Sequence, residues 1–153
     1  MTKRTARASA ARPSVRAATL SDAKAIAGLV TLLGYPTNAT HMKKRLESIF
    51  EDASYSTFVA ELGGEVVGMA GACLGRFYEK PGIYARIVAL VVSEAAAGRG
   101  VGAALVKSVE KWGASRDAVE IFLNSGVQRE ESRAFYERLG YRVTGVRFSK
   151  ELG

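Results

Sequence analysis

The sequence is poor in the residues from which disulfides, metal sites and histidine-dependent active sites are built. Its 153 residues include one cysteine, Cys73, and one histidine, His41. A lone cysteine cannot form an internal disulfide or a cysteine-rich zinc site, so we expect Cys73 to be a buried small residue in a protein of the reducing cytoplasm. A single histidine does not support a metal site or a serine-type triad, and we expect His41 to have no catalytic part.

A long uninterrupted apolar run is also missing. A membrane-spanning helix needs about 20 consecutive apolar residues, whereas the most apolar stretch, residues 83–97, contains Arg86 and Glu94. We therefore expect no membrane partner. The chain length and the 48% share of hydrophobic residues favour one folded domain with its own core.

Positive charge is concentrated at the N-terminus. Residues 1–14 carry four basic residues and no acid, so the net charge of +7 falls to +3 for the rest of the chain. This segment lacks the hydrophobic region of a secretory signal, although an Arg-rich leader also matches an organellar transit peptide. We predict a disordered basic tail over residues 1–13, a single domain over 14–153, and no nucleic-acid partner.

Hydrophobic periodicity predicts strands and helices in alternation after the tail. Helices are expected from Ala25 to Leu33, in a second segment capped by Thr40, and over 98–116 and 130–139. Strands are expected over 14–18, 56–62, 65–74, 83–92, 119–123 and 141–148. Gly63 and Gly64 predict a hairpin turn, and Gly140 a left-handed helix end. The order predicts an α/β (α+β) fold with a mixed, mostly antiparallel sheet and helices on both faces.

A glycine-rich junction separates the most apolar strand from the helix that follows it. Gly98, Gly100 and Gly102 let the backbone approach a ligand, and the first N–H groups of a helix lack intrahelical partners. Such a junction suits a pyrophosphate, although a tight turn without a ligand is the alternative. Neither the P-loop sequence nor the spacing of the dinucleotide fingerprint is present.

A second motif lies about thirty residues later, where Tyr136 is followed by Gly140 and Tyr141. The two motifs together resemble the GNAT family of acetyl-CoA-dependent N-acetyltransferases, whose pattern is Arg/Gln-x-x-Gly-x-Gly/Ala followed by Tyr-x-x-x-Gly-Phe/Tyr. The resemblance covers about residues 14–152 and is strongest over 87–141. It implies the acyl-CoA N-acyltransferase fold.

The resemblance also implies a site for acetyl-CoA as co-substrate. Leu90, Val91 and Val92 would offer backbone groups to the pantetheine arm, and Tyr136 would protonate the departing thiolate. The pyrophosphate would be held by Gly98, Arg99, Gly100, Val101, Gly102 and Ala103. Arg129 stands where many members have an asparagine that contacts CoA, in a run similar to that of branches that acetylate small amines.

Two positions depart from the family pattern. Ala97 replaces the usual Arg or Gln, so pyrophosphate binding would depend more on backbone donors and Arg99. Ala89 stands where members often carry an acidic base, so a water chain, Glu79 or Glu94 would have to help remove the proton of the amine.

The function that we predict from these residues is transfer of the acetyl group of acetyl-CoA to the primary amine of a small molecule by direct attack, without a metal. The alternatives are a protein N-terminal or lysine acetyltransferase and a non-catalytic acyl-CoA-binding module. The acceptor remains open among aminoglycosides, polyamines, aminoalkylphosphonates and amino acids. A homodimer, common in the family, is also open.

Overall fold

The structure, a computed structural model, describes residues 12–125 and 130–153. Most of the predicted tail and the predicted cofactor residue Arg129 therefore lie outside the described residues. The chain forms two compact units, one that ends at Phe122 and one that runs from Leu123 to Gly153. No helix of the described part is both long and apolar enough to cross a membrane.

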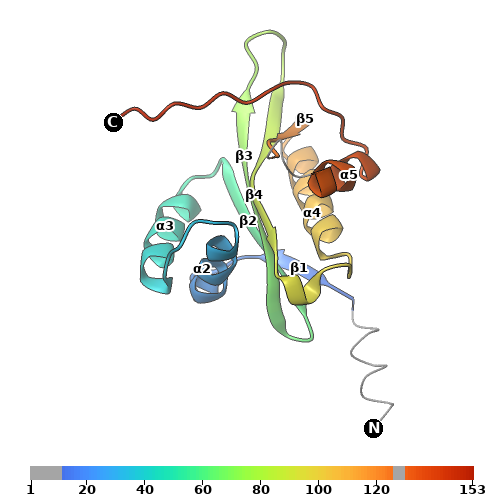
Figure 1. Ribbon diagram of the computed structural model, residues 1–153. Coiled ribbons are helices and arrows are strands. Elements are labelled where there is room, and N and C mark those ends of the chain that lie inside the picture. Colours follow the sequence, from blue (N-terminus) through green and yellow to red (C-terminus); the bar gives the residue numbers. More distant parts are fainter. Residues whose placement is uncertain (1–11, 126–129) are drawn as a thin grey trace. The chain divides into compact units, whose positions relative to one another are not determined.

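The first unit is built on a five-stranded sheet (Figure 1). Its strands lie in chain order: β1 (Ser14–Ala17), β2 (Tyr55–Leu62), β3 (Glu65–Arg76), β4 (Ile83–Val92) and β5 (Ala118–Leu123). The pairs β1–β2, β2–β3 and β3–β4 are antiparallel. Gly63 and Gly64 join β2 to β3 with φ angles of +57° and +84°, which confirms the predicted two-residue turn.

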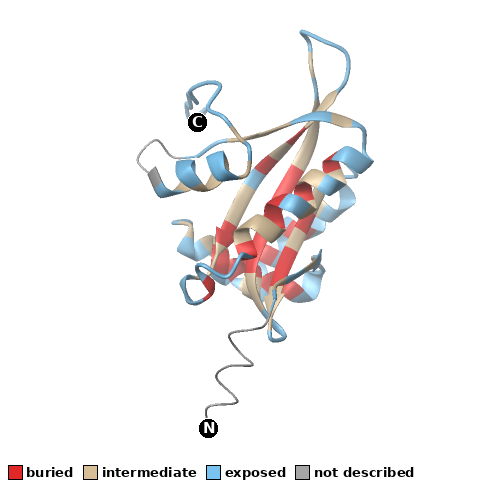
Figure 2. Cartoon of the chain, turned by 90° about the vertical axis from the view of Figure 1, so that its right-hand side faces the viewer, coloured by how far each residue is buried: buried red, intermediate tan, exposed pale blue. Residues whose placement is uncertain are grey.

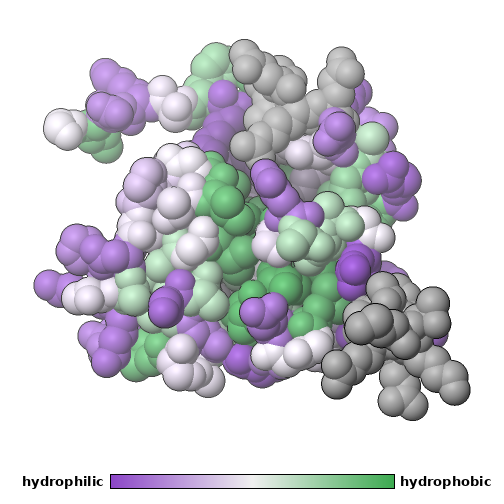
Figure 3. All heavy atoms as spheres, turned by 60° about the horizontal axis from the view of Figure 1, so that its bottom comes forward, coloured by the Kyte–Doolittle hydropathy of each residue, from purple (hydrophilic) through white to green (hydrophobic). Residues whose placement is uncertain are grey.

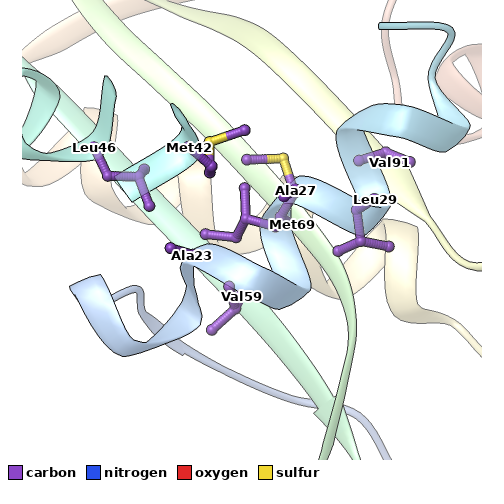
Figure 4. Packing of buried hydrophobic residues seen from close by; sticks show 9 residues of the cluster. Ala23, Ala27, Leu29, Met42, Leu46, Val59, Met69 and Val91 are labelled. Carbon is purple, nitrogen blue, oxygen red and sulfur yellow. The ribbon is translucent and has the colours of Figure 1, made fainter. Parts of the chain in front are cut away.

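Helices α2 (Ala23–Leu32) and α3 (Ala39–Glu51) cover one face of the sheet. Side chains of both helices pack against Val59, Met69 and Val91 in one buried cluster (Figure 4). A short 3-10 helix, η1 (Leu20–Asp22), leads into α2. The start of α3 corrects the sequence-based expectation, because the cap is Asn38, whose side chain accepts a hydrogen bond from the His41 N–H at 2.9 Å, and not Thr40.

Helix α4 (Val101–Ser115) covers the opposite face. A Cβ at Gly68 would lie 2.9 Å from Cγ1 of Val101 and 3.1 Å from Cδ1 of Leu105, so this glycine allows α4 to approach β3 closely. Gly68 and Met69 are neighbours on a strand, and neighbours point to opposite faces. Helices therefore lie on both faces, as predicted, and Figure 2 shows the buried residues of α4 against the sheet.

The second unit contains α5 (Glu130–Arg138). Gly140 follows it with a φ angle of +91°, and the Tyr141 N–H donates to the Tyr136 carbonyl at 3.0 Å, which confirms the predicted helix end. The predicted strand over 141–148 is wrong: the segment forms no strand, and Val146 and Phe148 are exposed. Alternating apolar residues show which side chains could share a face, but a strand also needs a neighbour to pair with.

Candidate functional site

The glycine-rich junction follows β4 directly. Residues 93–100 include a short 3-10 helix, η2 (Glu94–Ala96), and end at Gly100, the N-cap of α4. Gly98 and Gly100 have φ angles of +76° and +78°, and a Cβ at either position would have no neighbour within 4 Å. These glycines are therefore required by the backbone conformation and not by close packing. The space beside them is open.

Amide groups at the start of α4 are directed toward this junction. The first bond of the helix runs from the Ala104 N–H to the Gly100 carbonyl at 3.0 Å. The N–H groups of Val101, Gly102 and Ala103 consequently have no carbonyl partner within the helix. Gly100 offers no capping side chain. Three backbone donors and the positive end of the helix dipole thus form an arrangement suited to a phosphate group.

Burial decides whether each residue of the junction can contact a ligand through its side chain or only through its backbone. Val101 is only 1% exposed and its side chain packs toward β3, so only its N–H can contact a ligand. Arg99 and Ala97 are exposed. Figure 3 looks onto the end of the sheet at which β4 leads into η2, where hydrophobic residues form a continuous area among hydrophilic ones.

The C-terminal end of β4, Leu90–Val92, pairs with β3 on one side. The described side chains of β5 do not contact it on the other side. On one side, Leu90, Val91 and Val92 pair with Ala70, Met69 and Gly68 of β3. On the other side, β5 contacts the opposite end of β4 and the turn before it: Phe122 packs edge-to-face against Tyr84 at 5.2 Å, and Glu120 forms an ion pair with Lys80 of the turn. Tyr84 and Leu90 are six residues apart, which is about 20 Å along a strand. These side-chain contacts of β5 therefore lie at the Tyr84 end of β4 and not at Leu90–Val92.

An irregularity in β4 changes which of its side chains share a face. Gly71 pairs with Ala89 and Ala72 pairs with Ile87, so Val88 is an extra residue in β4. In a regular strand, residues 86 and 89 would point to opposite faces. The bulge instead places Ala89 opposite Gly71 and Arg86 opposite Cys73, on the face that α2 and α3 cover further along the sheet.

Arg86 belongs to a row of three residues across the sheet. Tyr55 of β2 lies opposite Cys73 of β3, and Cys73 lies opposite Arg86. Cys73 is half-buried, less than we expected from the sequence, and burial raises the pKa of its thiol although the charge of Arg86 acts in the other direction. The thiol is therefore protonated at neutral pH, which fits the prediction that Cys73 is not a nucleophile.

Aromatic rings lie beside this row. Tyr84 packs edge-to-face against Phe77 at 5.1 Å and against Phe122 at 5.2 Å. The ring of Tyr84 occupies the space above Gly75, where a Cβ would lie 2.3 Å from Cζ of the tyrosine. The aromatic cluster was not foreseen from the sequence. The feature that indicates the cluster is a glycine, Gly75, opposite Tyr84 in the paired strands. This pairing can be recognised only when the register is known.

Tyr136 lies on α5 of the second unit, where it is half-buried. Its ring packs edge-to-face against Phe135 at 5.0 Å and Tyr141 at 5.9 Å. Burial raises the pKa of the Tyr136 hydroxyl above its usual value of about 10. The side chain is thus a phenol with its proton at neutral pH, as a general acid must be.

The carboxylates that we considered as a base for the acceptor amine, Glu79 and Glu94, lie outside β4, the strand that contains Ala89. Glu79 is exposed in the turn between β3 and β4, and Glu94 is exposed in η2. Ala89 packs against the buried cluster and has no titratable group. Within the described ranges, no three His, Cys, Asp or Glu residues are grouped so that they could hold a metal ion.

Comparisons with known proteins agree on one family. The family model described as "Acetyltransferase (GNAT) family" matches residues 24–141. The curated protein N-acetyltransferase 8 of Rattus norvegicus is 27% identical over 109 residues, which cover 71% of this chain and 49% of the rat protein. The chain thus spans about half the length of the curated relative that it matches.

Solved structures show the same fold. A GNAT family acetyltransferase of Staphylococcus aureus is 30% identical, with a TM-score of 0.78 over 92% of this chain and 99% of that one. An aminoglycoside N-acetyltransferase in complex with CoA has 19% identity and a TM-score of 0.83 over 94% and 97% of the two chains. Glucosamine-6-phosphate N-acetyltransferase of Arabidopsis thaliana has 19% identity and a TM-score of 0.79 over 92% and 99%. Because the family model covers most of the chain and its motifs fall at the junction of β4 and α4 and on α5, this protein belongs to the GNAT acetyltransferase family.

Proposed function

We propose that the protein transfers the acetyl group of acetyl-CoA to the primary amine of a small molecule. The observation that carries this proposal is the junction of β4 and α4, where two left-handed glycines precede three helix amides without intrahelical partners in a chain of this family. The structural neighbour in complex with CoA and the neighbours named for small amino compounds support the choice of co-substrate and acceptor class.

Each part of acetyl-CoA has a proposed binding element. The amides of Val101, Gly102 and Ala103 and the side chain of Arg99 bind the pyrophosphate, in place of the cation that the family pattern usually has at Ala97. The edge of β4 at Leu90–Val92 binds the pantetheine arm by backbone hydrogen bonds, in the way that an added strand pairs with the edge of a sheet. Arg129, outside the described residues, is proposed as a further contact to CoA.

The chemistry that we propose needs one acid from the chain. The nitrogen of a neutral amine attacks the carbonyl carbon of the thioester, the C–S bond breaks, and sulfur takes the electron pair. Tyr136 donates its proton to that sulfur, a role for which its raised pKa keeps it protonated. Solvent takes the proton that the amine loses, directly or through Glu79 or Glu94.

Two other functions are distinguishable by experiment. Acetylation of a protein N-terminus or lysine would give turnover with peptides and not with free amines. A non-catalytic acyl-CoA-binding module would bind acetyl-CoA without releasing CoA with any acceptor. We expect a CoA-release assay over a panel of amines and peptides, read above the hydrolysis background, to show turnover with small amines.

Replacement of Gly100 by valine tests the cofactor junction. A branched side chain there would occupy the space that we assign to phosphate, so the Kd for acetyl-CoA should rise at least about tenfold by calorimetry while the domain stays folded. Gly64→Val is the matched control, because Gly64 has a similar φ angle of +84° but lies in the β2–β3 turn. An unchanged Kd in folded Gly100→Val would contradict the assignment.

A further inference from the structure

Arg86 is the one charged residue in β4, whose other residues are apolar or Tyr84. Partial burial of a guanidinium in such a strand costs free energy unless an anion or hydrogen-bond acceptor compensates it. Two other arginines of the described chain have such partners: Arg16 bonds to Asp22 and Glu61, and Arg116 donates to the Ala53 carbonyl. Arg86 forms no hydrogen bond or ion pair with any residue that the structure describes, although it is half-buried.

The described groups around Arg86 do not pair with it. The pKa of Cys73 is raised mainly by burial, so the opposite residue is an uncharged thiol. Asp52 also influences Cys73, but its carboxylate already accepts hydrogen bonds from the Ser54 N–H at 2.9 Å and the Ser54 hydroxyl at 2.6 Å. Those bonds lower the pKa of Asp52, so its carboxylate is ionised at neutral pH, but it forms no ion pair with Arg86. The N–H donors of Arg86 therefore have no acceptor among the residues that the structure describes.

The position of Arg86 relates it to the proposed reaction. The bulge at Val88 puts Arg86 on the same face as Ala89, three residues away and so about 7–10 Å along the strand. Ala89 directly precedes Leu90–Val92, beside which we placed the pantetheine arm. Figure 1 shows the β3–β4 hairpin extending beyond α2 and α3, and neither Arg86 nor Cys73 belongs to the buried cluster that these helices form with the sheet.

We propose that Arg86 binds an anionic group on the acceptor, so that the preferred acceptor is a primary amine that also carries a carboxylate, phosphonate or phosphate. This inference rests on the proposed function. The planar guanidinium offers paired N–H donors that match these anions, and the rings of Tyr84 and Phe77 give the acceptor an apolar wall beside it. The same charge disfavours polyamines and aminoglycosides, which are polycations.

Matched pairs of amines test this specificity. The pairs are 5-aminopentanoate with 5-aminopentanamide, and 3-aminopropylphosphonate with 3-amino-1-propanol, with spermidine as a polycation. We expect the wild-type kcat/KM to favour the anionic member of each pair. Arg86→Met should lower kcat/KM for that member by about 10- to 100-fold, through KM, and leave the neutral member nearly unchanged. Arg86→Lys should restore part of the preference because it keeps the charge.

The control and a binding measurement keep the two proposals apart. Lys111→Met removes one positive charge from the exposed surface of α4 and should keep the preference. Equal loss for both members of each pair in Arg86→Met, or no wild-type preference, would overturn the role of Arg86 while turnover still supports acetyl transfer. If no amine is acetylated, calorimetry with 3-aminopropylphosphonate in the presence of CoA decides: weaker binding by Arg86→Met supports the anion site, and equal affinity contradicts it.

Discussion

Two arginines of the same sheet show how the surroundings of a residue decide its use. Arg16 of β1 donates two hydrogen bonds of 2.8 Å to the carboxylate oxygens of Asp22 and a third to Glu61. These bonds raise the pKa of Arg16 and satisfy the guanidinium within the protein. Arg86 lies on β4, which β2 and β3 separate from β1, and it has no such partner among the described residues. The first arginine is structural, and we assign the second to an anionic ligand.

The role of Tyr136 is testable by removing one atom. Tyr136→Phe keeps the ring and its packing against Phe135 and Tyr141 but removes the proton that we assign to the leaving thiolate. We expect kcat to fall by about 10²- to 10⁴-fold with little change in the Kd for acetyl-CoA. Single-turnover kinetics locate the loss in the chemical step, and calorimetry measures the Kd. A wild-type kcat in this variant would show that another group or water protonates the sulfur.

At the scale of elements, the features that the sequence predicted correctly were those that depend on a few adjacent residues. The β2–β3 hairpin follows from Gly63 and Gly64, and the end of α5 from Gly140, because each glycine has a φ angle that other residues avoid. Helix α4 begins at Val101, three residues later than we expected, because the glycines extend the loop. The bulge at Val88 and the absence of a strand over 141–148 could not be predicted, since both depend on how neighbouring strands pair.

The contact between Asp22 and Arg16 joins two elements, because Asp22 ends η1 ahead of α2 and Arg16 lies on β1. Asp22 is 6% exposed and also accepts a hydrogen bond from the Thr19 N–H at 2.8 Å. The hydrogen bond with Arg16 is the main cause that lowers the pKa of Asp22 in the folded state. Its stabilising effect is therefore fully present above the unfolded pKa of about 4 and is lost as the pH falls through the lower folded pKa.

Replacement of Asp22 by asparagine should show this pH dependence. At pH 7 we expect the free energy of unfolding to fall by about 2 kcal/mol, because a charged hydrogen-bond partner is removed from a buried position. The difference from wild type should shrink as the pH falls from about 4 through the lower folded pKa, because the carboxylate of the unfolded chain takes up its proton before that of the folded protein. Urea denaturation at a series of pH values measures both effects. Glu47→Gln, at an exposed position of α3, is the control. A difference that stays constant down to pH 2 would contradict the ionic explanation.

At the scale of the whole molecule, the proposed site draws on motifs that are far apart in the sequence. The junction of β4 and α4 could be found from its glycines. Tyr136 could be found because its spacing from Gly140 in the sequence matches a family motif. Arg86 was visible in the sequence only as an interruption of an apolar strand. Its relation to Ala89 depends on the bulge, and the lack of a partner among the described residues depends on the fold, so neither could be read from spacing alone.

The absence of a carboxylate at Ala89 has a consequence for the pH dependence of the complete reaction. If solvent removes the proton, kcat/KM should rise with pH until the acceptor amine is largely neutral, and the rising limb should follow the pKa of the acceptor. Two good acceptors whose amine pKa values differ by about two units should give limbs about two units apart. Tyr136 does not obscure this limb, because its raised pKa keeps the acid protonated up to about pH 10. An identical rising limb for both acceptors would instead mean that an enzyme group, such as Glu79 or Glu94, acts as the base.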